Sequence, residues 1–228
     1  MKNKKIQTLS RKFPKTYSQE LGINTEKNWG EIFKWFIASL LFGKRITENT
    51  AKKTYREFRR EGLLTPKGIS EAGWDKLVEV LDAGGYARYD FSTATRLLDI
   101  MKGLEKKGGL ENLYKESENS RELEQKLKEF KGIGDVTTNI FLRELRFMSK
   151  IDPEISEFIK ISAKNLDIDL NINRKTKEFI HLESALLRLG KDYCRKNKCK
   201  KCPVTKYCKR KNHRLLKALG SSTASSLR

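Results

Sequence analysis

The chain has 228 residues, with 49 Lys and Arg against 29 Asp and Glu, which gives a net charge of +20. This length suffices for one large domain or two small ones with a real core, and a hydrophobic share of 37% argues against a globally disordered chain. No apolar run approaches the roughly 20 residues of a membrane span, and the polar residues after the charged N-terminus do not resemble a signal peptide.

Apolar residues recur at helical spacing along most of the chain. Residues 1–28 are polar and poorly periodic, and the first strong helix is expected from Trp29 to Gly43. In chain order, further helices are expected from Thr47 or Asn49 to Phe58, from Trp74 to Leu81, from Ser92 to Leu104, from Leu123 to Phe130, from Val136 to Leu145, from Asp152-Pro153 onward, and from Thr176 to Gly190. In the helix after Gly134, Val136 is expected on the apolar face with Ile140 and Phe141.

One segment departs from this pattern. Leu166, Ile168, Leu170 and Ile172 alternate with Asp and Asn, as in a strand. No second strand is available to pair with it, so we expect an extended loop. The chain is therefore predicted to be all-α, with short loops between roughly eight to ten helices. A Ser-rich tail, residues 217–228, is expected to be disordered.

The segment Phe130-Lys131-Gly132-Ile133-Gly134 stands between two amphipathic stretches. Two glycines one residue apart allow a tight turn and let backbone N–H groups approach a phosphate at the start of the next helix. An ordinary helix–helix turn would use glycine too. The net charge of +20 and the polar residues that follow the turn favour phosphate binding.

The four cysteines of the chain form one array, Cys194-x4-Cys199-x2-Cys202-x5-Cys208. Local clustering without an export signal indicates a metal or cluster site in a reducing, intracellular compartment. Zinc sites usually show two close pairs, and only Cys199 and Cys202 are close here. The uneven steps favour a [4Fe–4S] cluster, ahead of zinc, with disulfides last.

Positive charge surrounds this array. From Cys194 to Lys217 there are eleven Lys or Arg residues and no acidic residue. Such crowding is unfavourable unless a polyanion relieves it. Nucleic acid is the expected partner, ahead of an anionic membrane surface, although a solvated basic tail has the same composition.

An acidic residue, Asp152, lies eighteen residues beyond Gly134. Local sequence alone explains it equally well as a helix cap.

Taken together, the segment from Phe130 to Arg146, Asp152 and the four cysteines after Leu189-Gly190 resemble the endonuclease III-like, helix-hairpin-helix superfamily of DNA glycosylases. The resemblance spans Trp29 to Leu216. It implies two lobes, a central helical barrel and a cluster lobe made from both termini, with a groove that holds DNA and a flipped-out nucleotide. Residues 1–43 and 151–216 would form the cluster lobe, and residues 44–150 the barrel, with the hairpin at 122–146.

The resemblance also implies residue roles. Asp152 would be the catalytic carboxylate, with Glu154 as the alternative, and the four cysteines would hold the [4Fe–4S] cluster. The expected contacts to double-stranded DNA are Lys131, Gly132, Ile133, Gly134 and Thr137 at the hairpin, and Lys44 and Arg45 in the segment Phe42-Gly43-Lys44-Arg45.

The chain departs from the family pattern at one position that matters for chemistry. Bifunctional members carry a lysine nucleophile two residues beyond the second hairpin glycine, where this chain has Val136. Valine cannot form a Schiff base. We therefore expect a monomeric, monofunctional DNA glycosylase without a membrane partner. The alternatives are a non-catalytic lesion-binding protein and a lyase that uses a displaced lysine, Lys131 or Lys150. The array also has four residues between its first two cysteines, where the family has six.

Overall fold

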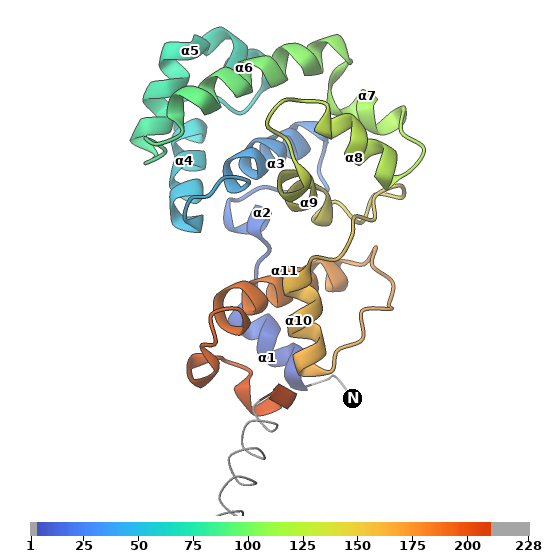
Figure 1. Ribbon diagram of the computed structural model, residues 1–228. Helices are drawn as coiled ribbons and strands as arrows, with labels where there is room; N and C mark the ends of the chain where they lie inside the picture. The colour runs from blue at the N-terminus through green and yellow to red at the C-terminus, as the bar shows by residue number, and fades with distance from the viewer. Residues whose placement is uncertain (1–3, 211–228) are drawn as a thin grey trace, which may run out of the picture. The chain divides into compact units, whose positions relative to one another are not determined.

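The computed structural model describes residues 4–210, and every regular element in that range is helical (Figure 1). The all-α prediction is therefore confirmed for this part of the chain. The helices form two compact units. In the described range, the first consists of residues 4–16 and 154–210, and the second of Tyr17–Pro153. No helix within 4–210 combines the length and the apolar character needed to cross a membrane. The expected tail at 217–228 lies outside the described residues.

The larger unit is built around one apolar helix. Its elements are α2 (Tyr17–Glu20), α3 (Trp29–Phe42), α4 (Glu48–Arg60), α5 (Pro66–Ala83), α6 (Asp90–Lys106), α7 (Gly109–Lys115), α8 (Ser120–Lys128) and α9 (Asp135–Arg143). Helix α3 packs against α4 and α9 (Figure 1). Most of its side chains are buried, because it is apolar on nearly every face.

One predicted domain boundary differs from the observed division of the chain. We expected residues 1–43 to join the C-terminal part of the chain, but the division falls at Thr16. The reason is the packing of α3, whose apolar surface is covered by elements of the Tyr17–Pro153 unit.

The smaller unit combines the described residues 4–16 with residues 154–210. It contains α1 (Lys4–Lys12), α10 (Glu157–Leu166), α11 (Lys177–Leu189), the π-helical turn η1 (Gly190–Cys194) and the 3₁₀ turns η2 (Cys199–Lys201) and η3 (Thr205–Tyr207). Helix α1 packs on α11, and α10 packs on α11 and η1 (Figure 1). The sequence pattern missed α1 because Leu9 is its only buried residue.

Several predicted helix ends are confirmed. Thr47 caps α4, its Oγ1 accepting from Thr50 N at 3.1 Å. Thr176 caps α11 through Phe179 N, also at 3.1 Å. The segment from Asp167 to Ile172 is a loop, as expected, without a strand.

The prediction that Asp152-Pro153 opens a helix is wrong. Residues 151–156 are irregular, and α10 begins five residues later, at Glu157, with Ser156 in the N-cap position. The side chain of Asp152 pairs with Arg146, and Ser156 rather than Asp152 takes the N-cap position of α10.

Candidate nucleic-acid interface and cysteine site

A six-residue turn joins α8 to α9. Ile133 N donates to the carbonyl of Phe130 at 3.0 Å, which closes the turn. Gly132 has φ +96°, a region that favours glycine because it has no Cβ. Ile133 is 5% exposed and anchors the turn in the core, so only its backbone is left for a ligand. Lys131 and Gly134 are exposed.

The N-terminus of α9 is open. Gly134 is its N-cap residue, and no side chain of the described residues caps it. A Cβ at Gly134 would meet no atom within 4 Å. The first N–H groups of a helix carry partial positive charge and favour an anion. Across the turn, Lys128 forms an ion pair with the exposed Asp135.

The second segment expected to contact DNA lies against this helix. A Cβ at Gly43 would overlap Oγ1 of Thr137, so the loop after α3 packs directly on the first turn of α9. Thr137 is only 5% exposed, and its side chain therefore joins the two segments within the unit. In the same loop Lys44 is partly buried and Arg45 is exposed.

One basic residue of this region has no signal in the sequence. Arg96, on α6, extends across the turn with its Cδ 2.7 Å from the place that a Cβ would take at Gly132. It also affects Lys44: burial, and then the positive charge of Arg96, lower the pKa of that lysine. No motif marks Arg96, because its neighbours come from segments far away in the chain.

The carboxylate of Asp152 is positioned by a buried arginine. Arg146 is 0% exposed and donates to Asp152 Oδ1, while the Asp152 side chain is 46% exposed. A second guanidinium nitrogen of Arg146 donates to the carbonyl of Pro153 at 2.8 Å. A bound guanidinium restricts the rotation of the carboxylate. Arg146 ends the segment that carries the resemblance, but no local pattern gives it a role.

The alternative carboxylate is far more exposed. The side chain of Glu154 is 90% exposed, and its Oε1 lies 3.5 Å from Lys160 Nζ. Such an exposed pair adds little stability and fixes little geometry. Asp152 is therefore the better positioned of the two candidates.

Val136 faces solvent; it stands where the bifunctional family members carry a lysine. Val136 is 64% exposed, so the expectation that it lies on the apolar face is wrong. The first turn of α9 buries Thr137 and Thr138 instead. The side chain of Val136 has no amine and therefore cannot form a Schiff base.

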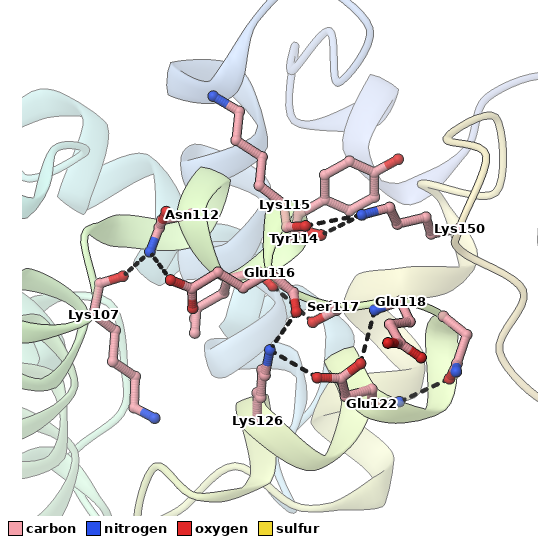
Figure 2. Close-up of polar contacts among 12 residues, drawn as sticks. Lys107, Asn112, Tyr114, Lys115, Glu116, Ser117, Glu118, Glu122, Lys126 and Lys150 are labelled. Carbon is pink, nitrogen blue, oxygen red and sulfur yellow. Dashed lines mark hydrogen bonds and ion pairs between the residues drawn. The ribbon is translucent and has the colours of Figure 1, made fainter.

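Lys131 and Lys150, the two lysines that could act in place of the family nucleophile, have different surroundings. Lys131 is exposed on the turn. Lys150 is engaged: its Nζ donates to the carbonyls of Lys115 at 2.9 Å and Tyr114 at 3.3 Å (Figure 2). It also lies 5.2 Å from the centre of the Tyr114 ring. These contacts hold the Lys150 ammonium at the end of α7.

The four cysteines line a single pocket of the smaller unit. Asn165, Tyr193, Thr205 and Arg210 complete its wall. None of the cysteines is in a disulfide, and each is half-buried. Cys194 ends η1, directly after α11, and the turns η2 and η3 bring the others. Asn165 Nδ2 donates to Cys194 Sγ at 3.7 Å. Burial raises the pKa of the Cys194 and Cys202 thiols.

The donor set of this pocket fits a metal group that binds sulfur. Four thiols can supply thiolates, which suit zinc or an iron–sulfur cluster, and metal binding removes their protons. In residues 4–210, no group of three or more His, Cys, Asp or Glu side chains is arranged to hold a metal ion. In the described part of the chain, the four cysteines are thus brought together as the lining of one pocket, not as a formed metal site.

No protein-family model and no curated protein matches this chain. The residues and geometry described above are therefore the basis for a function.

Proposed function

We propose that the chain is a DNA glycosylase that hydrolyses the N-glycosidic bond of a damaged or mismatched base. The observation that carries this proposal is the Asp152 carboxylate, half-exposed and held by the buried Arg146 rather than by a helix end. Departure of a base leaves an oxocarbenium-like sugar. A fixed carboxylate stabilises that positive charge and orients the attacking water.

Duplex binding is the second part of the proposal. The turn 129–134 and the open N-terminus of α9 would bind the DNA backbone, with Lys131, Lys44 and Arg45 adding positive charge. Contacts of this kind set the position of the protein and carry no base specificity. The target base must leave the stack to be reached, which costs least at a damaged or mismatched pair.

A screen of lesion-bearing duplexes tests the proposal. Duplexes with uracil, mismatched thymine, adenine, alkylated or oxidised bases are incubated with the protein, then treated with alkali to reveal abasic sites. Strand breaks that appear only after alkali support a monofunctional glycosylase. Lesion-specific binding without base release would favour the alternative, a lesion-binding protein in which the Arg146–Asp152 pair is structural.

The four cysteines would hold a [4Fe–4S] cluster in this proposal. They line one pocket as free thiols, and sulfur is the usual ligand of such a cluster. Four thiolate ligands leave no coordination position for a substrate, so the cluster would stabilise the smaller unit. The basic residues around the pocket, Lys198, Lys200, Lys201, Lys206, Lys209 and Arg210, would add to DNA affinity.

Borohydride should trap no covalent complex between the protein and lesion-bearing DNA. A Schiff base needs an amine at the sugar, Val136 has none, and Lys150 is held by two carbonyls. The measurement is a denaturing gel after incubation with borohydride, with Lys131→Met as the control. Trapping by the wild-type protein that disappears in Lys131→Met would establish the lyase alternative.

Replacing Gly134 by Leu should weaken binding to all duplexes by roughly tenfold or more, because a bulky side chain would stand where a phosphate meets the N-terminus of α9. The fold should tolerate the change, since φ is −115° and no atom lies within 4 Å of the new Cβ. Fluorescence anisotropy with damaged and undamaged duplexes measures the effect, and Gly134→Ala serves as the smaller, matched change. Unaltered affinity in Gly134→Leu would remove the turn from the DNA-binding surface.

A further inference from the structure

Two segments far apart in the sequence each place a basic side chain near the turn 129–134 and the first turn of α9. Arg96, from α6, lies across Gly132, with its Nε 3.2 Å from the place of a Cβ on that glycine. Lys44 comes from the loop after α3 and follows Gly43, which packs on Thr137 in the first turn of α9. Burial, and then the positive charge of Arg96, lower the pKa of Lys44. Both side chains are partly buried.

Two contacts hold the segment that leads into Lys44. Tyr86 Oη donates to the carbonyl of Leu41 at 2.7 Å, which ties the segment before α6 to the end of α3. The packing of Gly43 on Thr137 fixes the same loop from the other side. Both contacts fix the backbone just before Lys44.

No carboxylate of the described residues 4–210 forms an ion pair with Lys44 or Arg96. Two like charges at partly buried positions repel each other more strongly than they would in bulk water. An external anion would remove that repulsion. The unbalanced charge is therefore typical of an anion-binding site rather than of a stabilising contact.

We propose that Lys44 and Arg96 together bind one phosphodiester group of a DNA strand, beside the turn 129–134. Arginine offers several N–H donors in a planar fork that matches a phosphate, and lysine adds a compact charge. The identity of the polyanion rests on the proposed function. The site itself rests on the two side chains and their unbalanced charge.

The test compares two substitutions that each remove one positive charge from α6. Arg96→Met keeps an unbranched side chain over Gly132, and Lys102→Met changes an exposed lysine of the same helix. Loss of one phosphate contact should lower duplex affinity about eightfold at about 0.1 M salt, and reduce the slope of log affinity against log salt by about 0.9. Lys102→Met should leave both quantities close to wild type.

Two further variants distinguish binding from structural support. Arg96→Lys should recover most of the affinity, because it restores the charge. In Lys44→Met combined with Arg96→Met, the loss should be smaller than the product of the single losses, since both side chains contact one phosphate. Without DNA, Arg96→Met should unfold at the same or a higher temperature, because it relieves repulsion. A lower unfolding temperature with unchanged salt dependence would make Arg96 a support of the turn and overturn the proposal.

The outcomes separate this site from the proposed function. Equal effects of Arg96→Met and Lys102→Met on duplex binding would overturn the site, whatever the base-release assays show. A wild-type protein that releases no base, while Arg96→Met still weakens duplex binding, would overturn the glycosylase and leave the site. Inorganic phosphate is the last probe. If phosphate raises the unfolding temperature of the wild-type protein, but Arg96→Met does not alter duplex affinity, the pair binds free phosphate rather than DNA. That result would overturn the proposal.

Discussion

Replacing Asp152 by Asn is expected to slow base release by a factor of roughly 100 to 1,000, equivalent to about 3–4 kcal/mol of transition-state stabilisation. The substitution preserves the size of the side chain and an oxygen that can accept from Arg146. It removes the negative charge that would face the oxocarbenium-like sugar. Single-turnover assays on the duplex found in the lesion screen, with alkali to reveal abasic sites, measure the rate.

The controls for this prediction are DNA affinity and the neighbouring carboxylate. Duplex binding should persist in Asp152→Asn, because removing a negative charge cannot weaken attraction to phosphate. Glu154→Gln removes the same charge from a side chain that is 90% exposed, and should release base at close to the wild-type rate. If Asp152→Asn kept full activity and Glu154→Gln lost it, the catalytic assignment would move to Glu154.

Replacing Cys202 by Ser should abolish the metal site. The protein purified anaerobically is expected to be brown and to contain about four irons per chain, and the variant to contain close to none. Because metal binding and folding are coupled, the residues around the pocket should lose their protection from hydrogen exchange. The effect should concentrate in residues 154–210 and spare the Tyr17–Pro153 unit, which has its own core.

Thr205→Ala is the matched control for the cysteine substitution. Thr205 lines the same pocket but offers no thiolate, so its replacement should leave the iron content unchanged. Stoichiometric zinc without iron after native expression would replace the cluster by a zinc site. Iron that survives in Cys202→Ser at the wild-type amount would remove Cys202 from the ligands.

Local patterns were sufficient for much of the helical structure. The apolar residues of α3 recur at helical spacing, and Thr47 and Thr176 can accept hydrogen bonds from N–H groups three residues later. These signals lie within a few residues of the structure they predict. Elements with a weak local signal, such as α1 with its single buried Leu9, were missed for the same reason.

The predicted role of Asp152 as a helix cap shows where local patterns fail. Asp before Pro is a good start for a helix, yet the chain is irregular there and the carboxylate binds the buried Arg146 instead. Val136 likewise fits an apolar stripe with Ile140, but the first turn of α9 buries Thr137 and Thr138 instead. In both cases a contact outside the local repeat decides the outcome.

The sequence by itself determined the all-α class, the ends of the strongest helices, the four-cysteine array and the glycine turn before α9. Only the tertiary structure decided that Arg96 lies over Gly132, that Gly43 packs on Thr137, and that one pocket collects all four cysteines. The physical reason is the range of the interactions. Helix periodicity and capping act between near neighbours in the chain, whereas a buried contact such as that of Arg96 joins residues whose separation in sequence carries no repeating signal.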